Sequence, residues 1–121
     1  MELISQRRFE ELVADALDAI PDELAQALDN VAVIVEDEPT PAQRAEHGSL
    51  LGLYEGVSLA DRSPFSYGGV LPDRITVFRR SLCALAHNEA DLADQVRVTV
   101  IHELAHHFGI DDARLDELGW A

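Results

Sequence analysis

Cysteine and long apolar segments are scarce in this chain of 121 residues. The single cysteine, Cys83, excludes an internal disulfide framework and a metal site of the Cys-x-x-Cys type. No apolar run approaches the roughly 20 residues that a membrane span requires. Residues 1–11 also lack the apolar segment of a secretory signal. We therefore expect a cytoplasmic protein that does not associate with a membrane.

Basic residues are few as well. The chain has nine arginines, no lysine and 23 acidic residues, which gives a formal net charge of −14. Such a charge repels a phosphate backbone, so we expect no nucleic-acid partner, whereas a metal ion or a cationic peptide suits it better. The hydrophobic fraction of 47% is that of a globular protein. At this length we expect one domain over residues 1–121.

The N-terminal part predicts two helical segments and a strand. A first helix, with Ser5 as N-cap and Pro21 at its end, is indicated by apolar residues at helical spacing. These residues are Phe9, Leu12, Val13, Ala16, Leu17 and Ile20. Residues 22–29 predict a short second helical turn. The continuous β-branched run at residues 31–35 predicts a strand that is buried on both faces.

The middle of the chain predicts loops and two more strands. Two prolines break residues 36–49, which we expect to form a polar loop. Residues 50–57 and residues 74–79 each predict a strand. Between them, residues 58–73 are rich in proline and glycine and predict a long loop, a kind of segment that is usually functional or mobile.

Three helices are expected in the C-terminal part. Residues 81–86 predict a short helix, and Asn88 is an N-cap candidate for a longer one that runs to Phe108 and stops at Gly109. Residues 111–118 predict a last short helix. Helices and strands are mixed without strict alternation, so the expected fold class is α+β.

The long helix carries the motif His102-Glu103-x-x-His106. Residues four apart on a helix differ by about 6 Å in rise and about 40° in rotation, so His102 and His106 point the same way. Their imidazoles can meet on one zinc ion at about 2.0–2.1 Å. Glu103 then lies beside the metal, where a general base can act on water.

The opposite side of this helix is apolar, which favours its burial in the core. The residues expected on that side are Val98, Ile101, Leu104, Ala105 and Phe108. The helix would then present its two histidines and its glutamate to a cleft.

A catalytic zinc usually has three protein ligands and one open position. Gly109 can turn the chain back, and Asp112 follows at an offset that closes a tetrahedral site. Asp111 competes with Asp112 for this role. It would otherwise cap the last helix or accept a hydrogen bond from a ligand histidine.

The pattern HExxHxxGxxD resembles the elongated zinc motif of the metzincins, with aspartate in place of the usual third histidine. Together with the segments LLGLYEGVSLADR and LPDRITVFRR, it resembles the small bacterial zincin-like metallopeptidase family over residues 48–118. The resemblance implies a minimal zincin fold with a small mixed sheet, an N-terminal helix, an active-site helix and a short C-terminal helix.

The same resemblance implies the chemistry of the site. It assigns one Zn²⁺ per chain to His102, His106 and Asp112, and the role of general base to Glu103. The substrate would be a peptide or protein, whose extended backbone would pair with residues 50–57 as an edge strand.

Five other residues have simpler interpretations. His107 is rotated about 100° from His106 on the helix, so we expect it to be a surface or packing residue. Tyr67 is expected to cover the core rather than to stabilise an oxyanion. Cys83 is expected to be a buried apolar residue, and Arg79 to offset nearby acid together with its neighbour Arg80.

Two functions are compatible with these patterns. The first is a zinc-dependent metallopeptidase in which Glu103 acts on a metal-activated water. The alternative is a catalytically weak or inactive module of zincin fold that binds a partner peptide at its strand edge.

Overall fold

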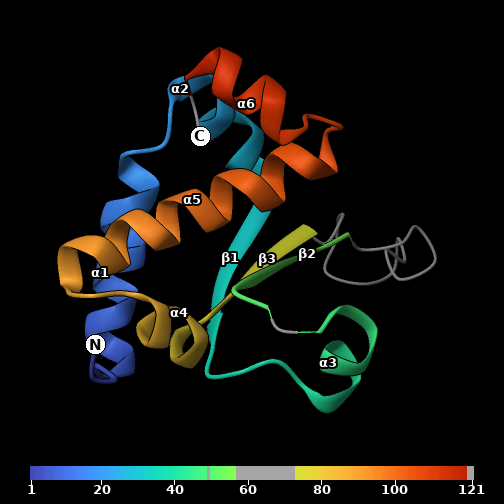
Figure 1. The fold of residues 1–121 in the computed structure, drawn as a ribbon. Helices are drawn as coiled ribbons and strands as arrows, with labels where there is room; N and C mark the ends of the chain where they lie inside the picture. Colours follow the sequence, from blue (N-terminus) through green and yellow to red (C-terminus); the bar gives the residue numbers. More distant parts are fainter. Residues whose placement is uncertain (49, 57–72, 120–121) are drawn as a thin grey trace, which may run out of the picture.

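The computed structural model describes residues 1–48, 50–56 and 73–119 (Figure 1). The predicted loop at residues 58–73, with Tyr67, lies outside these ranges except for its last residue. The α+β class is confirmed. The elements are α1 (Gln6–Asp18), α2 (Asp22–Ala25), the 3₁₀ helix η1 (Gln26–Asn30), β1 (Val31–Glu36), α3 (Pro41–His47), β2 (Gly52–Glu55), β3 (Asp73–Phe78), α4 (Arg79–Leu85), α5 (Glu89–His107) and α6 (Asp112–Leu118).

The three strands form a mixed sheet in the order β1-β3-β2. The central strand β3 is parallel to β1 and antiparallel to β2, and its residue Ile75 is aligned with Val33 on one side and Tyr54 on the other. The four residues from Ile75 to Phe78 are all buried. The prediction that β1 is buried on both faces is wrong: residues 31–35 are half-buried because β1 lies at an edge of the sheet.

Helix α5 crosses the sheet and packs on β2 and β3, with α1 packed against it (Figure 1). The stripe that α5 buries repeats every four residues along the helix, as an α-helix requires. It includes Leu92, Val96, Val100 and Leu104, all with 0% exposure.

The predicted apolar face of α5 is partly right. Ile101, Leu104 and Ala105 are buried as predicted, whereas Val98 is only half-buried. Phe108, which was also expected in the core, is 57% exposed. It is the C-cap residue, beyond the last turn that packs against the rest of the protein.

The ends of the long helices follow the capping signals in the sequence. The Ser5 side chain accepts a hydrogen bond from Arg8 N at 3.1 Å, and the Asn88 side chain accepts one from Asp91 N at 2.8 Å. Gly109 has a φ of 77°, the left-handed conformation that ends a helix and favours glycine.

Helix α3 corrects the prediction of a plain polar loop over residues 36–49. Thr40 and Gln43 form a capping box, in which each side chain bonds to the backbone N–H of the other residue. Pro41 occupies the first helical turn, where its missing N–H costs nothing. Pro41 therefore starts this helix instead of excluding it.

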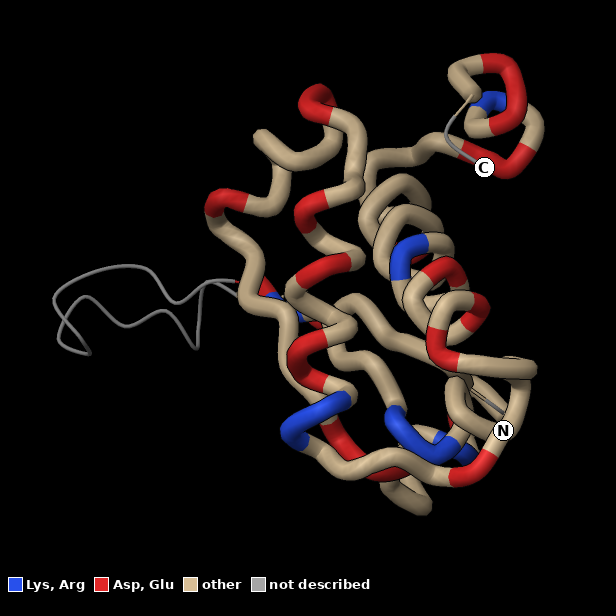
Figure 2. Tube along the Cα trace, turned by 90° about the vertical axis from the view of Figure 1, so that its left-hand side faces the viewer, with Lys and Arg blue, Asp and Glu red and all other residues tan. Residues whose placement is uncertain are grey.

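Acidic residues are spread over most of the chain, with few basic residues among them (Figure 2). Arg79 pairs with Asp37 at 2.9 Å and Arg80 with Glu38 at 3.5 Å, which confirms that these arginines offset nearby acid. Cys83 is buried, also as predicted. No helix in the described ranges is both long enough and apolar enough to span a membrane.

Candidate metal centre

The motif residues lie where α5 ends and α6 begins. His102, Glu103 and His106 are in the last two turns of α5, and Asp112 is the first residue of α6. The turn at Gly109 reverses the chain, with Ile110 N donating to Ala105 O at 2.8 Å. This tight turn brings the start of α6 back to the histidines.

The structure brings the three predicted ligands together. Asp112 Oδ1 lies 3.1 Å from His106 Nε2 and 4.0 Å from His102 Nε2. The two imidazole centroids are 5.8 Å apart, with an angle of 24° between the ring planes. The Asp112 side chain is 72% exposed, so this group opens to solvent.

These side chains are of the types that bind zinc, and their positions are close to those that one zinc ion would require. Two ligand atoms at about 2.0–2.1 Å from one tetrahedral zinc are about 3.3 Å apart. The distance from Asp112 to His106 meets this requirement, and the distance from Asp112 to His102 exceeds it. As the side chains lie, no group of three or more His, Cys, Asp or Glu in the described ranges is arranged to hold a metal ion. The ligand assignment therefore stays a prediction.

The two neighbouring aspartates have different surroundings. Asp111 Oδ1 accepts a hydrogen bond from Arg114 N at 2.8 Å and is the N-cap of α6. Asp112 is the one whose carboxylate lies beside His102 and His106. Of the roles that the sequence leaves open for Asp111, the cap is thus the one found.

Glu103 is half-buried between α5 and β2. Its Oε2 accepts a hydrogen bond from the backbone N–H of Tyr54 at 3.2 Å. Burial raises the pKa of the Glu103 carboxyl, and the Tyr54 N–H, His106 and His102 offset this rise only in part. A raised pKa makes the carboxylate a stronger base, as a general base requires.

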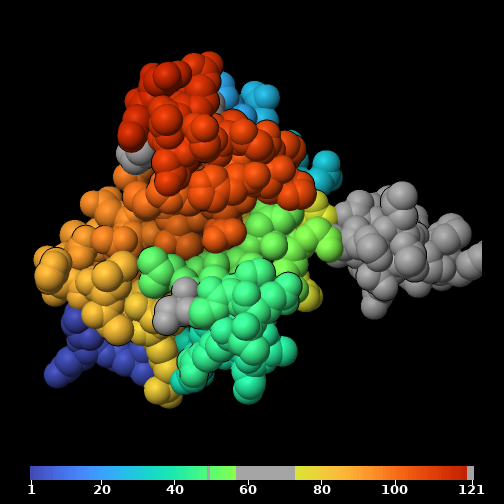
Figure 3. Space-filling model, turned by 45° about the vertical axis from the view of Figure 1, so that its right-hand side comes forward, coloured from blue at the N-terminus to red at the C-terminus, as the bar shows by residue number. Residues whose placement is uncertain are grey.

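Gly52 allows α5 to lie this close to β2. A Cβ atom on Gly52 would be 2.6 Å from Thr99 Cγ2 and 3.8 Å from Glu103 Cγ. In Figure 3 the C-terminal part of α5 lies directly against β2. The glycine that weakens the strand by composition thus has a packing function at the candidate site.

The sequence did not point to a second group of residues next to Glu103. Tyr54 Oη donates to Asp73 Oδ2 at 2.7 Å, and the Tyr54 ring stacks on His107 with a centroid distance of 3.9 Å and an angle of 14°. His107 is a packing residue, as predicted. Alternation in the strand places Tyr54 and Gly52 on one face, but it does not identify the helix that covers this face.

Comparison with known proteins supports the resemblance. Residues 28–120 match the sequence model of a family described as zincin-like metallopeptidase. The chain belongs to this family. The match contains the three strands, the motif helix α5 and α6.

A solved structure supports the fold of this zincin-like protein. It is described as a conserved hypothetical protein from Thermo thermophilus and is 27% identical to this chain. The match covers 87% of this chain and 94% of the other, with a TM-score of 0.54. The description assigns no activity to that protein. No curated protein matches this zincin-like chain.

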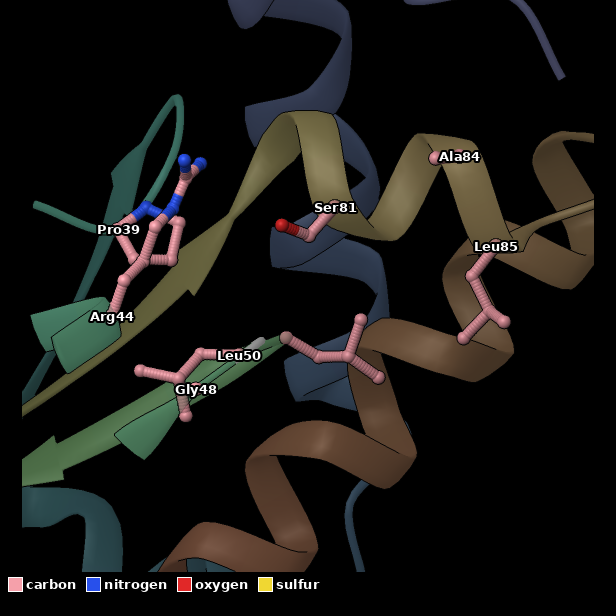
Figure 4. Close-up of a pocket in the computed structure, with 8 residues that line it drawn as sticks. Pro39, Arg44, Gly48, Leu50, Ser81, Ala84 and Leu85 are labelled. Carbon is pink, nitrogen blue, oxygen red and sulfur yellow. The ribbon is translucent and has the colours of Figure 1, made fainter. Parts of the chain in front are cut away.

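The zincin-like protein also has a surface cavity of about 660 Å³ between α3, α4 and the residues before β2 (Figure 4). The described residues that line it are Pro39, Arg44, Gly48, Leu50, Leu51, Ser81, Ala84 and Leu85. None of them belongs to the candidate metal centre.

Proposed function

We propose that this zincin-like protein is a zinc-dependent peptidase. The observation that carries the proposal is the convergence of His102, His106 and Asp112 at the end of the helix that holds the Glu103 carboxylate. Two imidazoles, one carboxylate and a neighbouring glutamate make up the donor set and base of a catalytic zinc site. Family membership supports the same reaction class.

His102, His106 and Asp112 are the residues that would hold the metal. When bound, zinc acts as a Lewis acid that polarises a scissile carbonyl and acidifies a water molecule. This ligand set leaves a fourth position for water or substrate.

Glu103 supplies the proton transfer. Its carboxylate takes a proton from the attacking water and then delivers it to the nitrogen of the leaving amine. The burial that raises its pKa strengthens it as a base. The bond from Tyr54 N–H holds the carboxylate beside α5 while it acts.

The substrate we propose is an extended peptide. β2 lies at the edge of the sheet next to Glu103, and an extended backbone can add to such an edge through main-chain hydrogen bonds. The formal charge of −14 favours a cationic peptide over an acidic one.

The test compares the wild type with Glu103→Gln and His106→Ala. Zinc content is measured by elemental mass spectrometry, and hydrolysis is measured on a broad peptide library. We expect Glu103→Gln to keep its zinc and to lose about 10²- to 10⁴-fold in rate, since it lacks the base. We expect His106→Ala to lose both zinc and hydrolysis.

Two outcomes would overturn this proposal. Full turnover by Glu103→Gln would exclude its role as the base, and a wild type that binds no added zinc would exclude the metal centre. A wild type that binds zinc and library peptides but cuts none of them would favour the binding module with a zincin fold.

A further inference from the structure

We propose that Tyr54 is a positioning residue for Glu103, and that Asp73 and His107 hold Tyr54 in place. The effect on rate rests on the proposed peptidase function. The effect on the Glu103 hydrogen bond does not, because that bond exists within the protein itself.

The first contact runs through the backbone. Tyr54 N–H donates to Glu103 Oε2 at 3.2 Å, across 49 residues of sequence. A glutamate side chain has several rotatable bonds and many rotamers in solvent. Because one carboxylate oxygen is bonded to β2, the location of this strand limits where the Glu103 carboxylate can lie.

The second contact runs through the Tyr54 ring, which stacks on His107 at 3.9 Å. His107 follows Glu103 by four residues, so the two lie one turn apart on the same side of α5. Tyr54 therefore contacts α5 at two points, through its N–H and through its ring. Two contacts restrict the rotation of the strand relative to the helix more than one contact does.

The third contact attaches Tyr54 to the sheet. Its hydroxyl donates to Asp73 Oδ2 at 2.7 Å, and His107 Nε2 lies 4.0 Å from the same oxygen. Asp73 is the first residue of the central strand β3. A charged acceptor makes this bond shorter and stronger than a neutral one.

The position of Glu103 matters because proton transfer requires close approach. A misplacement of about 1 Å in a reacting group can reduce a rate by about 10²-fold. β2 has only four residues and lies at an edge of the sheet, so backbone pairing alone holds it weakly. The ring of Tyr54 and its two neighbours supply further attachment.

The neighbouring residue Glu55 provides a matched control. It lies on the other face of the strand, where it pairs with Arg74 at 3.4 Å. A substitution of Glu55 therefore perturbs β2 to a similar extent, but it leaves the contacts with α5 in place.

The activity test uses Tyr54→Ala, Tyr54→Phe, His107→Ala and Glu55→Gln at equal zinc content. We expect Tyr54→Ala and His107→Ala to lower kcat by about 10- to 100-fold with little change in KM, as loss of an orienting partner does. We expect Tyr54→Phe, which keeps the stack and loses the bond to Asp73, to fall between these variants and the wild type. His107→Phe restores a stacking ring and should recover most of the rate that His107→Ala loses.

A second readout needs neither zinc nor substrate. Amide hydrogen exchange at Tyr54 N–H, measured by NMR on the zinc-free protein, reports the bond to Glu103 directly. We expect exchange at this amide to rise about tenfold or more in Tyr54→Phe and His107→Ala, while the Leu53 amide changes much less. A merely structural loosening of β2 would instead raise exchange at both amides alike.

The outcomes separate this inference from the proposed function. If the wild type cuts peptides and Tyr54→Ala retains the kcat of Glu55→Gln, the positioning role is wrong and the peptidase stands. If the wild type cuts nothing, the peptidase is wrong, and selective exchange at Tyr54 N–H still decides whether Asp73 and His107 hold the bond to Glu103. Equal exchange in all variants would overturn the inference on its own.

Discussion

At the scale of single residues, Gly52 sets the distance between α5 and β2. The space for its missing Cβ is taken by the Thr99 methyl group at 2.6 Å, and Thr76 O follows at 3.1 Å. Glu103 follows Thr99 by one helical turn. A substitution that moves Thr99 away from β2 therefore also moves Glu103, the candidate base.

We expect Gly52→Ala to destabilise the protein by about 1–3 kcal/mol, because the added methyl group overpacks this contact. The measurement is urea unfolding. Gly56→Ala is the matched control, since a Cβ at Gly56 would be 3.7 Å from its nearest neighbour, an ordinary contact. Thr99→Ser removes the obstructing methyl group and should recover part of the loss in the double variant. Equal stability of Gly52→Ala and Gly56→Ala would contradict the close approach.

The adjacent aspartates offer a second comparison at this scale. We expect Asp112→Asn to weaken zinc binding by more than about 10-fold, because it removes the proposed anionic ligand. Asp111→Asn keeps a good helix cap and should leave zinc affinity near that of the wild type. Competition with a chromogenic chelator measures both affinities. The reverse order would transfer the ligand role to Asp111.

The sequence could predict the site only where a single segment sets the geometry. His102, Glu103 and His106 lie on one helix, whose periodicity places them on neighbouring positions. Asp112 follows a glycine turn in the same segment. Tyr54 and Asp73 lie on other elements, β2 and β3, and come close to Glu103 and His107 only in the folded protein. The spacing of residues within one segment cannot predict such contacts.

At the scale of elements, the capping residues in the sequence predict the helix ends better than apolar runs predict burial. Asn88 and Gly109 mark the two ends of α5 correctly. Thr40 and Gln43 are the same kind of capping signal for α3, although the nearby prolines favour a loop when only composition is considered. The prediction that β1 is buried on both faces is wrong for a different reason: an apolar run does not show whether a strand is central or at an edge of the sheet.

The long helix depends on the residues that it buries. We expect Leu104→Ala to destabilise the protein by about 2–5 kcal/mol, since Leu104 has 0% exposure and truncation leaves a cavity. Leu85→Ala is the control, because Leu85 is 49% exposed and should cost less than about 1 kcal/mol. Urea denaturation of both variants tests the difference. Similar losses would mean that α5 is not anchored through this residue.

At the scale of the whole molecule, the charge of −14 opposes compaction. Arginines are too few to pair with every acidic residue, and the pairs that form at the surface contribute little. Salt screens such repulsion, with a Debye length of about 10 Å at 0.1 M.

We therefore expect the urea midpoint of the zinc-free protein to rise as NaCl increases from about 10 mM to about 200 mM. Repeating the titration with KCl separates screening from effects of one particular salt. A midpoint that falls or stays constant would show that attractive ion pairs outweigh the net repulsion.

The strand order has a further consequence for how the chain is made. Both outer strands, β1 and β2, pair with β3, which leaves the ribosome after them. During synthesis, the apolar residues 31–35 therefore remain without their sheet partners until residues 73–77 have emerged. The candidate centre comes later still, because α5 and Asp112 follow β3. A nascent chain of this protein thus acquires its sheet and its metal ligands late, after the N-terminal helices and both outer strands have already been made.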